Sequence, residues 1–183
     1  MKKIITMLMI GQLIVFLNID INGFDLLFDS IGYGFIAYSL YQYNQAEFID
    51  LRIGLPIVGA VLAFIDSLLF YNSTGILGSL SWSVMSIIHF FVVLEILKLL
   101  HSRAKSFQYQ DFIDGVENLR RSYQLTFGVS FSLNVFSILL PNMVTGIAAL
   151  VFAVLLIIFA VLLIIAEVRI LFRINKFRTL EVA

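Results

Sequence analysis

The stretch MVTGIAALVFAVLLIIFAVLLIIAEVRILF, residues 143–172, decides the fold class that this chain is expected to adopt. Its only charged residues are Glu167 and Arg169, and both lie towards its end. A helix that crosses a bilayer needs about 20 mainly apolar residues. This run is longer than that, so the sequence predicts a membrane-spanning helix whose carboxyl end projects into water.

Similar apolar runs recur along the whole chain of 183 residues, which is 61% hydrophobic and only 13% charged. A soluble domain of this size needs more polar surface to cover its core. Lys2 and Lys3 precede the first run as in a signal peptide, but no small-x-small cleavage site follows, so we expect a retained helix. The sequence predicts an all-α, six-helix transmembrane bundle in a single domain, with helices at about 4–20, 29–44, 54–71, 78–99, 122–140 and 143–172.

The distribution of charge predicts the orientation of this bundle. With six spans, all twelve Lys and Arg residues fall on one side of the membrane. Cytoplasmic loops of membrane proteins carry an excess of these residues. We therefore expect a multi-pass protein of the cell membrane with both termini in the cytoplasm.

The first external turn, NIDINGFDLLFDS at residues 18–30, carries Asp20, Asp25 and Asp29. The simpler interpretation is that acids are tolerated on the outside and that Asp29 caps the second helix, where its charge suits the helix dipole. The alternative is an acidic mouth that raises the local concentration of cations.

Charged groups within the apolar runs are costly and need a structural or functional reason. Asp66 lies in the third run, on the same helical face as Gly59 and Ala63, so we expect it to point into the bundle where helices approach closely. Counted inward from the external helix ends, Ser83 and Asn134 lie at nearly the same depth as Asp66.

Two interpretations of these polar side chains remain open. Serine and asparagine can simply form hydrogen bonds between neighbouring helices. Alternatively, they line a cavity open to the outside, which would bind or transport a small cation or a cationic solute. The ligand-binding residues would then be Asp66, Ser83, Asn134, Asp25 and Asp29.

Three further polar residues of the apolar runs have ordinary explanations. Glu95 and Glu167 lie next to Lys98 and Arg169 near the expected cytoplasmic boundary, so ion pairing and snorkelling account for them. We interpret His89 as a hydrogen-bonded histidine of the core.

Apolar residues recur at helical spacing between residues 104 and 121, where Phe112, Val116 and Leu119 share one face. The pattern predicts a short amphipathic helix on the inner membrane surface. Alternatively, Phe112 and Val116 dock a membrane or cytoplasmic protein, and the chain is an accessory or regulatory protein rather than a transporter.

Motifs of recognised catalysis are absent from the sequence, which has no HExxH, no GxSxG and no Walker loop. It has two histidines and no cysteine, so a metal centre is not expected. We predict no catalytic residue, no enzymatic activity and no cofactor. The lipid bilayer is the expected environment, and no nucleic-acid partner is expected.

The segment FDLLFDSIGYGFIAYSL resembles one found in small multi-pass membrane proteins of Gram-positive bacteria, whose function is uncharacterised. Their segment reads Asp-x-Leu-Pro-Asp-Phe-x-Gly-Tyr. Asp25, Leu27, Asp29, Gly32 and Tyr33 match it, while Phe28 and Ser30 depart from it. The resemblance covers about 20 residues of the chain and implies a membrane topology rather than an activity.

Overall fold

The computed structural model of the chain describes residues 2–17, 20–21, 24–25, 29–47, 51–69, 76–139 and 147–180. Within them lie six helices and one pair of short strands. The helices are α1 (Lys2–Leu17), α2 (Asp29–Glu47), α3 (Gly54–Leu69), α4 (Ile76–Ser106), α5 (Gln110–Leu139) and α6 (Ile147–Leu180). The strands are β1 (Asp20–Ile21) and β2 (Phe24–Asp25), which pair antiparallel with Asp20 opposite Asp25. The predicted six helices are confirmed, and β1 and β2 lie within the acidic segment 18–30.

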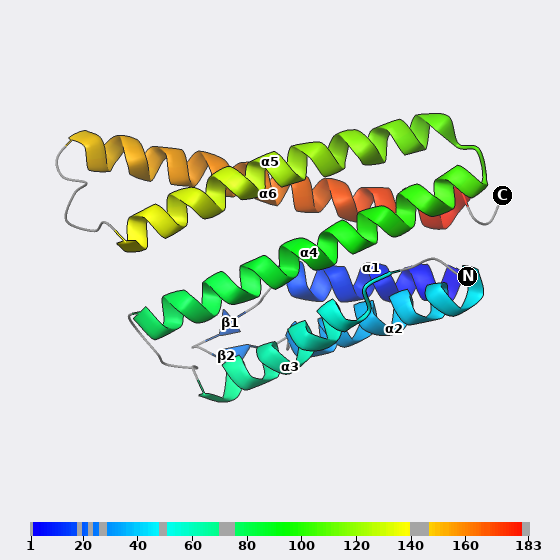
Figure 1. Cartoon of the computed structure of the whole chain (residues 1–183), viewed down its shortest axis with the longest axis horizontal. Helices are drawn as coiled ribbons and strands as arrows, with labels where there is room; N and C mark the ends of the chain where they lie inside the picture. Colours follow the sequence, from blue (N-terminus) through cyan, green and yellow to red (C-terminus); the bar gives the residue numbers. More distant parts are fainter. Residues whose placement is uncertain are drawn as a thin grey trace.

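The helices run up and down along the long axis of the molecule. Each packs against its neighbour in sequence, and α6 packs back against α1, so the contacts form a closed ring. Figure 1 shows the two termini and the turn between α4 and α5 at the same end of the bundle. The amino end of α4, the carboxyl end of α5 and the amino end of α6 lie at the opposite end.

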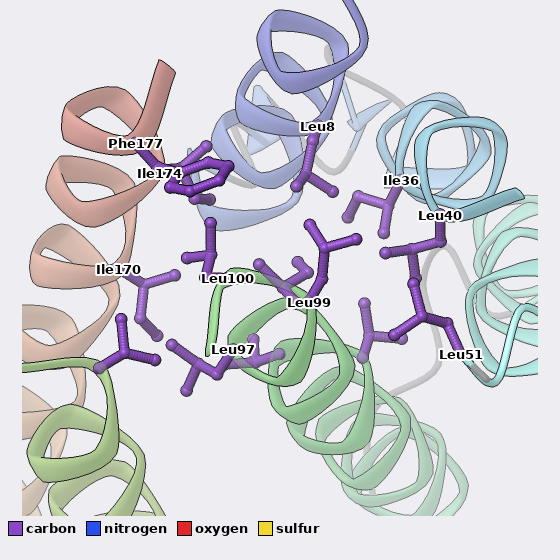
Figure 2. Packing of buried hydrophobic residues seen from close by; sticks show 14 of the residues in the cluster. Leu8, Ile36, Leu40, Leu51, Leu97, Leu99, Leu100, Ile170, Ile174 and Phe177 are labelled. Atoms are coloured by element: carbon purple, nitrogen blue, oxygen red, sulfur yellow. The ribbon is translucent and has the colours of Figure 1, made fainter. Parts of the chain in front are cut away.

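The apolar core is concentrated at the end of the bundle that holds the termini. Figure 2 shows α1, α2, α4 and α6 meeting there through interlocked side chains, among them Leu8, Leu40, Leu99, Leu100 and Phe177. By contrast, no residue of α6 between 149 and 165 is buried. The amino-terminal half of α6 thus turns most of its apolar side chains outward.

Two segments of the described chain are long and apolar enough to cross a membrane, Ser83–Ser106 of α4 and Ala149–Leu180 of α6. A third apolar helix, Gly54–Ser67, is shorter. By length and composition these helices indicate association with a membrane.

Helices α1 and α2 touch at two glycines. A Cβ atom at Gly11 would lie 2.7 Å from the carbonyl oxygen of Gly32, and one at Gly32 would lie 2.6 Å from Cγ2 of Val15. Only glycine permits backbones to approach this closely. In the same Gly-Tyr-Gly stretch, a Cβ at Gly34 would meet nothing within 4 Å.

This difference predicts opposite effects of two neighbouring substitutions. Gly32→Ala should lower the free energy of unfolding by about 1–3 kcal/mol, because the added methyl group overpacks the contact with α1. Gly34→Ala should be neutral or raise it by up to about 1 kcal/mol, since alanine favours the helix. Thermal unfolding in detergent measures both, and equal midpoints for the two variants would contradict the described helix contact.

The segment 104–121 is not the separate amphipathic helix that its sequence pattern predicts. Helix α4 continues to Ser106, and Gln108 then reverses the chain with φ of 58°. The amides of Gln108 and Tyr109 donate to the carbonyls of Lys105 and Ala104. This arrangement ends α4 with a Schellman motif. Helix α5 begins at Gln110 and continues as one helix to Leu139.

The prediction of a free docking face at Phe112 and Val116 is also wrong, because both side chains are buried inside the bundle. The Phe112 ring lies 5.6 Å from that of Phe177, and the Arg173 guanidinium lies 5.6 Å above it. At Gly115 a Cβ would come within 2.3 Å of the Arg173 side chain, so this glycine makes room for it. The carboxyl end of α6 covers the apolar face.

Candidate functional site

Five of the six helices contribute one polar side chain each to a network around Glu167 of α6. Gln12 of α1 donates from Nε2 to Glu167 Oε2 over 2.8 Å. The Tyr123 hydroxyl of α5 also hydrogen-bonds the carboxylate. His89 of α4 lies with Nε2 3.1 Å from Glu167 Oε1. The carboxylate is therefore held from three sides.

His89 extends this network to α2. Its Nδ1 atom lies 3.3 Å from the hydroxyl oxygen of Tyr33, and the two rings meet edge to face. Tyr33 is 1% exposed and packs with its ring against Gly59 of α3. A continuous chain of hydrogen bonds thus runs from Tyr33 through His89 to Glu167. The interpretation of His89 as a hydrogen-bonded core histidine is confirmed.

The network is buried, so its polar groups lose their hydration when the protein folds. Gln12 is 0% exposed and Glu167 is 7% exposed. A buried carboxylate is tolerated only where donors or an opposite charge compensate for its lost hydration. Gln12, Tyr123 and His89 provide that compensation, although the Gln12 Oε1 atom has no hydrogen-bond partner among the described residues.

The network forms one wall of a cavity with a volume of about 440 Å³. Helices α1, α2, α4, α5 and α6 enclose it, and Asp29, at the amino end of α2, lies on its wall. This volume lies within the range of pockets that bind small molecules, about 300–1,000 Å³. The lining residues are the polar Asp29, Tyr33, Ser86, His89, Tyr123, Ser130 and Glu167 and the apolar Val15, Phe16, Met85, Phe127, Phe131, Leu163 and Ile164.

The residues predicted from the sequence are dispersed by the fold. Asp29 lines the cavity, whereas Asp66, Ser83 and Asn134 are not among its lining residues. Asp66 is half-buried and accepts a hydrogen bond from Ser81 of α4. As expected, Gly59 and Ala63 on the same face of α3 are buried. A ligand-binding role for Asp66 stays a prediction.

Asn134 comes from α5, and α4 lies between α5 and α3 in the order of packed helices. The equal depth predicted for Asp66 and Asn134 therefore does not by itself bring them together. Asp25 belongs to β2. Its part in binding also stays a prediction.

The two glutamates that the sequence explained by ion pairing behave differently. Glu95 does pair with Lys98, over 3.8 Å, and it also accepts a hydrogen bond from the Arg52 amide over 3.2 Å. Glu167 instead pairs with His89, while Arg169 is exposed. The expectation of an ion pair at the membrane boundary is therefore wrong for Glu167.

Sequence reasoning also missed Gln12, Tyr33 and Tyr123 as site residues. One signal was present for Glu167, because it shares a helical face with Leu163, Ile170 and Ile174 at spacings of four, three and seven residues. The last two of these are fully buried. An acid on such a face is expected to point inward.

Comparisons of the chain with protein-family models, with curated proteins and with solved structures found no match. Within the described residues, no group of three or more His, Asp or Glu side chains is placed to hold a metal ion. The network and its cavity are therefore interpreted from their own chemistry.

Proposed function

We propose that this chain is a six-span protein of the cell membrane that binds a small organic cation in the cavity beside Glu167 and transports it. The observation that carries the proposal is a buried carboxylate on the wall of a cavity that is also lined by the aromatic rings of Phe16, Phe127 and Phe131. The proposal keeps the predicted function, which is to bind or transport a cation or a small cationic solute, but it assigns the binding site to Glu167 rather than to Asp66.

Six spans are supported by the apolar side chains that every helix turns outward. Examples are Leu13 of α1, Val61 of α3, Ile87 of α4, Leu125 of α5 and Ile157 of α6, all at least 37% exposed. On α6 the exposed large apolar residues follow one another closely from Leu150 to Ile165. A soluble monomer rarely exposes a contiguous apolar surface of this kind. Hydrocarbon around the bundle would cover them, and the shorter α1 and α3 would cross with local thinning of the bilayer.

The distribution of basic residues supports an orientation with both termini inside the cell. The bundle end that carries the termini also holds the turn between α4 and α5 (Figure 1). Basic residues gather at this end, as the positive-inside rule requires. They include Lys2, Lys3, Arg52, Arg103, Lys105 and Arg178.

A cationic ligand is favoured by the charges of the cavity. Asp29 and Glu167 are the acids on its wall, and no described Lys or Arg lines it. Aromatic rings attract cations through their faces. Phe16, Phe127 and Phe131 would surround the apolar part of an organic cation, while Glu167 and Asp29 would attract its charge.

Phe16 and Asp29 line the cavity and lie near the outer ends of α1 and α2 in the proposed orientation, which supports an opening towards the outside. The acidic hairpin directly precedes α2. A cation would therefore enter from the outside, past Asp29, and reach Glu167 in the interior.

Binding of benzyltrimethylammonium tests this proposal. In detergent the ligand should raise the thermal midpoint of the wild-type protein, by the equivalent of about 2.7 kcal/mol at a hundredfold excess over Kd. Glu167→Gln removes the charge but keeps the shape, and it should abolish the shift. Glu117→Gln, which changes an acid paired with Arg120 and Arg121 on the surface, is the matched control and should retain the shift. A wild-type midpoint that does not respond to any concentration would refute cation binding.

A further inference from the structure

We infer that the bound cation is exchanged for a proton held by His89 and Glu167, so that cation binding at this site releases a proton. The inference rests on the proposed cation binding and adds the coupled ion. Its basis is the pairing of one histidine and one carboxylate at the cavity wall, with a partner for each ring nitrogen.

The hydrogen bonds of His89 suit both of its protonation states. In the neutral ring with a proton on Nε2, that nitrogen donates to Glu167, and Nδ1 accepts from the Tyr33 hydroxyl. In the charged ring, Nε2 still donates to Glu167, and Nδ1 donates to the Tyr33 oxygen. A hydroxyl group is both a donor and an acceptor, so neither state leaves a buried nitrogen without a partner.

The net charge of the pair differs between these two states. When His89 is neutral, the pair has a net charge of −1, which comes from the Glu167 carboxylate. When His89 is protonated, its positive charge cancels that of the carboxylate, and the net charge of the pair is zero. Charge without compensation is costly in a buried site. The cation should therefore bind more tightly when the His89–Glu167 pair is negative than when it is neutral, whereas the charge of Asp29 on the cavity wall is the same in both cases.

The other groups that face the pair do not supply a competing positive charge. They are Gln12 from α1, Tyr33 and Asp29 from α2, and Tyr123 from α5. Among the lining residues of the cavity, His89 alone can become positive near neutral pH. A proton on its ring and an organic cation beside Glu167 are consequently alternatives.

The reaction balances without any further reactant. Protonated His89 loses the Nδ1 proton to solvent, the cation enters, and the charge of the site is unchanged. Binding should therefore weaken as the pH falls, because protons occupy the site. Over the range in which one proton is exchanged, affinity should rise about tenfold for each pH unit.

Benzyltrimethylammonium is a suitable probe because it has no proton of its own to release. Calorimetric titration in two buffers of different ionisation enthalpy measures cation binding and proton release in one experiment. For wild-type protein we expect about one proton released per bound cation at the pH where the site is protonated. His89→Gln should bind with an affinity that does not vary between about pH 5 and 8 and should release no proton.

His101→Gln is the matched control, since it changes the other histidine of the chain, which does not line the cavity. It should behave as the wild type does. Tyr33→Phe keeps His89 but removes the partner of Nδ1, so its pH profile should move to lower pH. This second variant keeps the test valid if His89→Gln does not fold.

The outcomes separate the two proposals. Binding without proton release in the wild type, or release that persists in His89→Gln, would overturn the exchange and leave cation binding intact. An absence of any binding to the folded wild-type protein at every pH would overturn the proposed function itself.

Discussion

Glu167→Ala should lower the free energy of unfolding by about 3–5 kcal/mol, since it leaves buried partners without the group that satisfies them. Gln12, His89 and Tyr123 all hydrogen-bond the Glu167 carboxylate. A buried donor that loses its partner costs about 1–3 kcal/mol. The alanine also leaves a void where α1, α4 and α5 meet α6. Thermal unfolding in detergent measures the loss.

The control is Glu117→Ala on the surface of α5. Glu117 pairs with Arg120 over 3.8 Å and with Arg121 over 3.2 Å. Exposed ion pairs contribute about 0–1 kcal/mol, so this variant should unfold close to the wild-type midpoint. If the two alanine variants shift the midpoint by the same small amount, the Glu167 network does not hold the helices together as described.

The sequence predicted the helices well because their apolar runs are long and their ends carry clear signals. Asp29 begins α2, and Pro56 lies in the first turn of α3, where proline is tolerated. Within 104–121 the helical prediction is correct for the part from Gln110 onwards, which belongs to α5, but the sequence did not predict the reversal at Gln108. The pattern does not say what covers its apolar face, and the cover comes from α6, far away in the sequence.

The site was harder to predict because its members lie on five different helices. Glu167 was assigned to Arg169, its neighbour in sequence, but residues two apart on a helix point about 200° away from each other. The residue that pairs with Glu167 is 78 positions away. Such a pairing depends on the order in which the helices pack, and composition and spacing do not determine that order.

Asp29 shows how a partly correct prediction arises. The acidic turn indicated an external mouth, and Asp29 does line the cavity. Asp66 was favoured as the inner acid because it is the acid in the third apolar run. The structure instead places a different acid, the buried Glu167, on the wall of the cavity, where His89 and Tyr123 also lie.

In the proposed function, the cavity opens to the outside and holds a cation next to Glu167. The chain contains no cysteine, so one introduced thiol can be labelled without background. Ser130→Cys places the thiol on the cavity wall, and Ser106→Cys places it at the exposed carboxyl end of α4. The reagent is a membrane-impermeant trimethylammonium-ethyl methanethiosulfonate, whose charge matches that of the proposed ligand.

The most direct measurement is the rate of labelling in intact cells, with and without benzyltrimethylammonium. The Ser130→Cys variant should react from outside, and the added cation should slow its labelling in proportion to occupancy of the site. The Ser106→Cys variant should react only after the cells are permeabilised. An inert thiol at position 130, a labelling rate that the cation leaves unchanged, or labelling at position 106 in intact cells would contradict the account.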